Sequence, residues 1–206
     1  MKIASVVMVA NGPSLLTKRL GAKIDSFDRV IRINHFATNG HHPHVGLRTD
    51  IWSTSLVNWD RHPSEFLEVW FLSHLKNHAK VYGTLMSHGP HVNGRFMRNW
   101  PETVWYVGSD VFGPLYDELG YTTESHLWPS TGLLSIAAML YRFPDAELNI
   151  CGFDCFKDAK VGEDTPHYFA EPSYSVPVFS GRHDPAKERA YIAGKIKEGR
   201  LVDLGA

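Results

Sequence analysis

The residues with the clearest chemical potential stand at 129–132, where Pro-Ser-Thr-Gly comes directly before the apolar run LLSIAAMLYRF. Ser130 can cap the helix that this run predicts, because a serine oxygen accepts a hydrogen bond from an N–H of the first turn. A first turn of Ser, Thr and Gly also leaves backbone N–H groups exposed, and such groups bind anions such as phosphate. The stretch therefore predicts a helix start, and it leaves a phosphate site open as a second interpretation.

A second candidate is Asn11-Gly12-Pro13-Ser14, which ends the apolar run KIASVVMVA. A strand followed by a glycine turn and a helix is typical of nucleotide sites, but the chain lacks G-x-G-x-x-G, so a dinucleotide site is not indicated. The same four residues are also a good turn without any ligand. Asn34 ends the next predicted strand, and its amide can both donate and accept at the same edge of the sheet. For Arg48 we expect a salt bridge to Asp50 or to a neighbouring loop.

Histidine is abundant, with 12 in the chain, and His183 is one of them. An imidazole whose pKa is near neutral pH can accept a proton from an attacking hydroxyl. In so histidine-rich a chain a lone histidine is more often structural, and Tyr168 and Phe169 can equally be aromatic packing under a loop. The cluster His-His-Pro-His at 41–44 has no Cys or carboxylate at ligand spacing, so we expect a polar loop rather than a metal site.

Composition is that of an ordinary globular protein, with 43% hydrophobic and 21% charged residues. A formal net charge of −1 gives no basic field that would attract nucleic acid or an anionic membrane. Cys151 and Cys155 are too few for the disulfide framework of a secreted domain. The N-terminal run MKIASVVMVA is too short for a membrane span and has no convincing cleavage site. We therefore expect a cytoplasmic protein without an integral membrane segment.

Apolar runs and helical periodicity alternate along the chain. Predicted strands cover 2–10, 27–36, 49–55, 68–73, 79–84, 103–108 and 146–154. Predicted helices cover 15–20, 112–119, 132–143 and a last segment that starts at Asp184 and Pro185. This alternation indicates an α/β sandwich with a mainly parallel sheet, in one domain over residues 1–206. Such sheets bind ligands at the carboxyl ends of their strands, where both NGPS and GFDCF fall.

Four segments together resemble the motifs of the family 29 sialyltransferases. VVMVANGPSLL, IDSFDRVIRINHF and VGLRTDIW are similar to the large motif of the family, and WPSTGLLSIAAMLYRFPDAELNICGFD is similar to its small motif. HYF at 167–169 resembles the third motif, and HDPAKE at 183–188 resembles the last, a His followed five residues later by Glu. The four stand in the order of the family and span residues 5 to about 192.

This resemblance implies a Rossmann-like fold, the GT-A-like variant of sialyltransferases, and inverting, metal-independent transfer from a CMP-linked sugar. His183 takes the role of general base and Glu188 a supporting one, while His167 and Tyr168 would stabilise the departing phosphate. The residues implied in donor binding are Asn11, Gly12, Asn34, Ser130, Thr131, Gly132, Gly152 and Phe153. The expected partners are a CMP-sugar donor and a glycan or glycolipid acceptor, with no cofactor and no metal.

The sequence also departs from the family. The large motif has no cysteine, and Cys151 takes the place that Tyr usually holds before Gly-Phe, so the disulfide of the eukaryotic members is missing. Without that bridge, an anchor or a stem, the chain resembles a compact bacterial or viral member. Residues 55–128 match no motif, which leaves the acceptor open. Two other functions stay open as well: transfer from CMP-Kdo, and nucleotide binding without turnover.

The segment from Asp154 to Gly181 is long, rich in proline and poor in regular periodicity. Such loops in compact domains are usually functional or disordered. Because the segment carries His167 and Tyr168, we expect a lid over 155–180 that closes on the nucleotide and excludes water. The alternative is a loop that its aromatic side chains keep permanently ordered.

Overall fold

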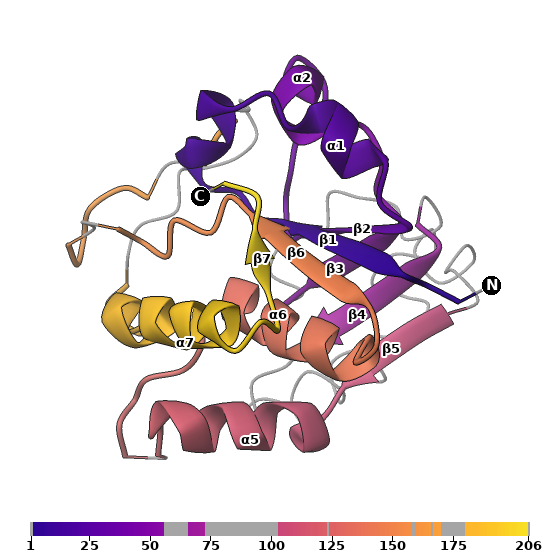
Figure 1. Ribbon diagram of the computed structural model, residues 1–206. Coiled ribbons are helices and arrows are strands. Elements are labelled where there is room, and N and C mark those ends of the chain that lie inside the picture. The colour runs from indigo at the N-terminus through magenta and orange to yellow at the C-terminus, as the bar shows by residue number, and fades with distance from the viewer. Residues whose placement is uncertain are drawn as a thin grey trace, which may run out of the picture.

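The computed structural model describes residues 2–55, 66–72, 103–122, 124–157, 160–165, 167–169 and 180–205. Within them, seven strands form one sheet in the order β5-β4-β3-β2-β1-β6-β7, and every pairing is parallel (Figure 1). The strands are β1 (Ser5–Val9), β2 (Arg29–Ile33), β3 (Ile51–Thr54), β4 (Glu68–Leu72), β5 (Thr103–Val107), β6 (Glu147–Cys151) and β7 (Val202–Asp203). The helices are η1 (Pro13–Thr17), α1 (Gly21–Asp25), α2 (His42–Val45), α5 (Ser109–Leu119), α6 (Thr131–Arg142) and α7 (Pro185–Lys197). The predicted α/β sandwich with a parallel sheet is confirmed.

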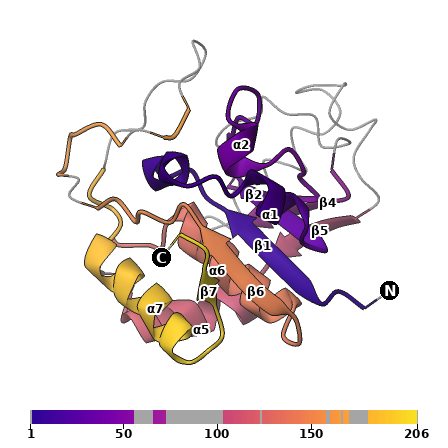
Figure 2. The same cartoon turned by 45° about the horizontal axis from the view of Figure 1, so that its top comes forward.

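Helices cover both faces of this sheet, with η1, α1 and α2 on one face and α5, α6 and α7 on the other (Figures 1 and 2). The central strand β1 shows the consequence. Val6 and Met8 pack into the cluster shared with α5 and α6, whereas Val7 and Val9 pack into the cluster under η1 and α1. None of the four is more than 1% exposed. The continuous apolar run is therefore a strand buried on both faces, as its composition predicts.

Arg32 shows that β2 is buried on both faces as well. This arginine is fully buried, and it donates to the carbonyl of Val45 at 2.6 Å, the carbonyl of Arg48 at 3.1 Å and Oγ1 of Thr49 at 3.0 Å. A buried charge is tolerated only when hydrogen bonds replace its hydration. The guanidinium thus joins β2 to the segment that leads into β3.

Some predicted boundaries differ from the structure. The helix expected at 15–20 is instead the 3₁₀ helix η1, whose first residue is Pro13, followed by α1. The loop expected at 41–44 contains α2, a one-turn helix that buries Val45 and ends at Gly46 with a φ of 72°. The described residues hold no group of three side chains suited to a metal ion. The strand predicted at 79–84 lies outside the described residues, and β7 is too short to leave a pattern.

The order of the strands reverses between β1 and β6, because the chain builds from β1 to β5 in one direction and then returns to the other side of β1. In parallel sheets, ligands bind outside the carboxyl ends of the strands at such a switch point. The loops after β1, β2 and β6 all start from this edge. In the part of the chain that the structure describes, no helix is long and apolar enough to cross a membrane.

Candidate active site

The loops after β1 and β6 lie against each other at the carboxyl edge. The N–H of Gly12 donates to the carbonyl of Gly152 at 2.9 Å, which extends the strand pairing into the loops. A Cβ on Gly12 would lie 2.5 Å from the carboxylate of Asp154 and 2.6 Å from the Gly152 carbonyl, so only glycine fits. Gly152 has a φ of 74°, and a Cβ there would meet Leu15 at 2.7 Å. Both glycines serve the close approach of the two loops, and their contact with a donor stays a prediction.

Asn11 and Asn34 join the ends of β1, β2 and β3. Nδ2 of Asn11 donates to the carbonyls of His35 at 2.8 Å and Ile33 at 3.2 Å, while its buried Oδ1 accepts no hydrogen bond from the described residues. Asn34 has a φ of 48°, and its Oδ1 accepts from the N–H of Ser55 at 3.1 Å. Asn11 is thus left with an acceptor and Asn34 with its amide nitrogen. Both residues are predicted to contact the donor substrate. The amide nitrogen of Asn34 can donate to a phosphate oxygen, and Oδ1 of Asn11 can accept from a hydroxyl or amino group.

The Pro-Ser-Thr-Gly turn starts α6 as predicted, with Ser130 as its cap. Oγ of Ser130 accepts from the N–H of Leu133 at 3.2 Å and donates to Oε2 of Glu188 at 2.6 Å, while the Ser130 N–H donates to Oε1 at 2.7 Å. Ser130 is therefore fully engaged within the protein, which does not support its predicted contact with the donor. The N–H groups of Thr131 and Gly132 donate to no acceptor among the described residues, so they keep the capacity to bind an anion.

Glu188 ties the start of α7 to the start of α6. Its side chain is 2% exposed, and both carboxylate oxygens face Ser130. Burial raises the pKa of Glu188 to about 7, although the hydrogen bonds from Ser130 oppose the rise. The cap of α7 is Asp184 instead, whose Oδ1 accepts from the N–H groups of Ala186 and Lys187. Glu188 thus holds Ser130, and the supporting role in the reaction that the sequence predicts for it stays a prediction.

His183 lies beside this junction. Its Nδ1 is 2.8 Å from the carbonyl of Trp128, and the N–H of Trp128 donates to the carbonyl of Arg182 at 3.0 Å. Since a carbonyl only accepts, the proton of the neutral ring sits on Nδ1, and Nε2 carries a lone pair. Burial lowers the pKa of His183, which keeps the imidazole neutral at neutral pH. This geometry suits a general base.

The third motif occupies the opposite face of the sheet edge. Tyr168 packs with the cluster under η1, and its hydroxyl donates to the carbonyl of Ala37 and accepts from the Ala37 N–H. Its own N–H donates to the carbonyl of Asn11 at 3.0 Å. Burial is the larger cause and the nearby His35 the smaller cause that together lower the pKa of His167 to about 4, so this ring is neutral. Tyr168 holds the segment in place, and the hydroxyl contact with phosphate predicted for it is not supported.

Half of the predicted lid over 155–180 lies outside the described residues. Of its described parts, Tyr168 and Phe169 are 4% and 5% exposed and belong to the core. These two residues pack into the core, and the closure of the segment on the nucleotide stays a prediction.

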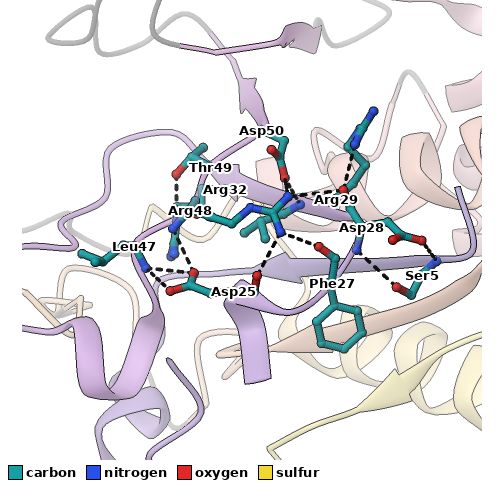
Figure 3. A network of polar contacts seen from close by, with 11 residues as sticks. Ser5, Asp25, Phe27, Asp28, Arg29, Arg32, Leu47, Arg48, Thr49 and Asp50 are labelled. Atoms are coloured by element: carbon teal, nitrogen blue, oxygen red, sulfur yellow. Dashed lines mark hydrogen bonds and ion pairs between the residues drawn. The ribbon is translucent and has the colours of Figure 1, made fainter. Parts of the chain in front are cut away.

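Arg48 belongs to a structural network away from this site, shown in Figure 3. Its guanidinium donates to Oδ2 of Asp50 at 2.7 Å and to the carbonyls of Asp25 at 2.9 Å and Phe27 at 2.6 Å. The carboxylate of Asp25 in turn accepts from the N–H groups of Leu47 and Arg48. The expected salt bridge is confirmed.

Two functional contributions are invisible in the sequence. The Trp128 carbonyl that fixes His183 is a backbone group, and no pattern of side chains reveals it. Phe156 lies flat on His183, but it stands outside every motif. The ring of Phe153 lies 3.3 Å from the position of a Cβ on Gly132, and its predicted contact with the donor stays a prediction.

A parallel α/β sheet with a switch point defines a Rossmann-like fold, and the start of α6 and the half-buried His183 lie at its carboxyl edge. The chain belongs to glycosyltransferase family 29 (sialyltransferase), whose family model matches residues 2–199.

Individual relatives and structures agree with this family. The rat type 2 lactosamine alpha-2,3-sialyltransferase is 54% identical over 43 residues, which are 21% of this chain and 13% of that protein. The mouse CMP-N-acetylneuraminate-beta-galactosamide-alpha-2,3-sialyltransferase 4 is 25% identical over 217 residues, 96% of this chain and 63% of that protein. The chain thus spans less than two thirds of these relatives. A crystal structure of a mammalian sialyltransferase aligns with a TM-score of 0.65 and 18% identity over 98% of this chain and 69% of the other, which shows the shared fold.

Proposed function

We propose that the protein transfers sialic acid, or a related acid, from its CMP ester to a glycan hydroxyl with inversion of configuration. The observation that carries the proposal is the unit formed by His183, the Trp128 carbonyl and the start of α6. Hydrogen bonds join His183 to the Trp128 carbonyl and Glu188 to the Ser130 N–H, so the segment that carries the neutral imidazole is tied to the start of α6. The N–H groups of Thr131 and Gly132 at this helix start donate to no acceptor among the described residues.

In the proposed reaction, Nε2 of His183 takes the proton of the acceptor hydroxyl as its oxygen bonds to the anomeric carbon. The bond from that carbon to the phosphate oxygen breaks, and its electron pair leaves with CMP. Negative charge grows on the phosphate, and the N–H groups of Thr131 and Gly132, at the positive end of α6, can stabilise it. The neutral ring of His167 can add a hydrogen bond, and Tyr168 positions it. We propose that no step requires a metal.

The names of the relatives favour one donor and one acceptor class. The mouse relative is named for CMP-N-acetylneuraminate and a beta-galactosamide, and the rat relative for type 2 lactosamine, both with alpha-2,3 linkage. We therefore propose CMP-N-acetylneuraminate as donor and a terminal galactoside as acceptor. CMP-Kdo is the second candidate, because it presents the same carboxylate and leaving group. A module that only binds nucleotide would have no need for a base held as His183 is.

The test is to incubate the protein with CMP-N-acetylneuraminate or CMP-Kdo, with and without lactosamine, in excess EDTA, and to measure free CMP and glycan product. The proposal predicts sialylated lactosamine from the first donor, undiminished by EDTA. Product only from CMP-Kdo would replace the donor, and activity that needs added Mg²⁺ or Mn²⁺ would overturn the metal-free mechanism. CMP binding without any turnover would favour the binding module.

A further inference from the structure

Phe156, in the turn after β6, makes an offset stacked contact with the proposed base. Its ring centroid lies 5.3 Å from that of His183, and the two planes differ by 11°. We propose that Phe156 is a positioning residue, whose ring fixes the plane of the His183 imidazole so that Nε2 is held toward the acceptor hydroxyl. This inference rests on the proposed function of His183.

The contact completes the restraint of the imidazole. A single hydrogen bond from Nδ1 to the Trp128 carbonyl fixes one atom of the ring, but it lets the ring turn about the axis of that bond. A flat ring against one face removes this freedom, because a turn of the imidazole would break the stacked contact. The two contacts together define where Nε2 lies.

The backbone that presents Phe156 is unusual. Cys155 and Phe156 are consecutive non-glycine residues with φ of 47° and 53°, in the left-handed region that side chains disfavour. Arg189 of α7 donates to the Cys155 carbonyl at 3.3 Å, and the N–H of Lys157 donates to the carbonyl of Asp154 at 2.9 Å. Such strain persists only where the surroundings impose it, and it concentrates at functional sites. Ordinary packing of an aromatic ring would not require this turn.

The ring also belongs to the apolar surroundings that keep His183 neutral. The segment of His183, the start of α7 and the turn after β6 carry these charged or titratable groups: Arg182, Asp184, Glu188, Arg189, Asp154 and Cys155. Of these, the charge of Arg182 acts on His183 and lowers its pKa, in the same direction as burial, while the bond to Trp128 raises it. Removal of the Phe156 ring admits water, so the pKa of His183 should rise toward its ordinary value.

The experiment compares Phe156→Tyr, Phe156→Leu and Phe156→Ala with the wild-type protein. The pKa of His183 is followed by histidine NMR, with its signal assigned by loss in His183→Gln, and kcat/KM is measured against pH. We expect Phe156→Leu and Phe156→Ala to raise the pKa of His183, to move the acid limb of the profile to higher pH and to lower kcat about 10–100-fold. Phe156→Tyr keeps a flat ring and should stay near wild type. CMP affinity should not change in any of them.

Phe143→Leu is the matched control, since it removes a buried ring that lies against Trp70 at the far end of α6. It should lower thermal stability and leave the pKa of His183 and the profile unchanged. A His183 pKa and a pH profile that are the same in Phe156→Leu as in wild type would overturn the inference. If the wild-type protein transfers no sugar, the proposed function fails instead. If Phe156→Ala does not fold, the Tyr and Leu variants decide.

Discussion

Two polar networks differ in how their charges are balanced. In the arginine network of Figure 3, the Arg48 guanidinium meets the Asp50 carboxylate at 2.7 Å, so opposite charges face each other. At the carboxyl edge, Glu188 is buried against the hydroxyl and N–H of Ser130, and no ion pair with Glu188 occurs among the described residues. Its pKa is raised to about 7, and that of His183 is lowered.

This difference separates structure from chemistry. In a network of paired charges the partners satisfy each other, so the network needs no ligand. Groups whose charged forms are disfavoured by burial concentrate at functional sites, because they exchange protons in the working range of an enzyme. We therefore expect the arginine network to contribute to stability and the carboxyl edge to contribute to the reaction. Substitutions in each network test both expectations.

The largest expected effect is on turnover when the base is removed. His183→Ala should lower kcat about 10²–10⁴-fold, since it removes the proposed acceptor for the proton of the attacking hydroxyl. CMP affinity, measured by calorimetry, should stay close to wild type. The matched control is His126→Asn, an exposed histidine with a φ of 52° that Asn tolerates. Activity retained in His183→Ala, or lost equally in the control, would remove His183 from its proposed role.

The next effect is on stability against pH, through Glu188. Its pKa is about 7 in the folded protein, above the ordinary value of 4.5, so the folded state holds the proton more tightly. The free energy of unfolding should therefore fall as pH rises from about 4.5 through 7. Glu188→Gln cannot ionise but can still bond Ser130, so it should lose this dependence and gain stability relative to wild type as pH rises.

Glu188→Ala is the counterpart variant. It leaves the buried Ser130 N–H without a partner and opens a cavity, so it should be less stable than Glu188→Gln by about 2–4 kcal/mol at every pH, because neither variant ionises at this position. Thermal melts from pH 5 to 8 measure all three proteins. A constant difference between wild type and Glu188→Gln would show that burial does not perturb the carboxyl group.

The smallest effect on activity is expected in the arginine network. Arg48→Met should lower stability by about 1–2 kcal/mol, because the side chain is partly exposed and its lost hydrogen bonds are partly replaced by water. The control is Arg29→Met, since Arg29 donates to the Asp28 carbonyl alone among the described residues and should matter less. Both variants should keep the kcat of wild type at a temperature where they are folded. A lower kcat in Arg48→Met without unfolding would contradict the separation of the two networks.

Some of this organisation is readable in the sequence. The runs that become β1 and β6 are continuous and apolar because both faces of the sheet are covered, and Ser130 caps α6 because its type and place suit that role. His183 is singled out by its motif, and Arg48 by its nearness to Asp50.

Other features depend on distant contacts. Ser130 and Glu188 are 58 residues apart, so neither residue reveals that the serine is already engaged by the glutamate. The sequence around Tyr168 gives no sign that its hydroxyl bonds the backbone of Ala37, which is 131 residues away. The left-handed turn at Phe156 contains no glycine that would signal it. The roles of these residues depend on their burial and on contacts with residues far away in the sequence, which the local sequence pattern does not show.

The central claim is that the donor nucleotide binds at the carboxyl edge, against the start of α6. Among the described residues, basic side chains line a hollow at the opposite edge, where Arg29 and Arg142 line a cavity of about 380 Å³ together with Glu68. The most direct measurement is a titration of the ¹⁵N-labelled protein with CMP, followed by amide NMR. The account predicts the largest shifts at the N–H groups of Thr131 and Gly132, with little change at Arg29 and Arg142. The largest shifts around the two arginines, with Thr131 and Gly132 unmoved, would contradict it.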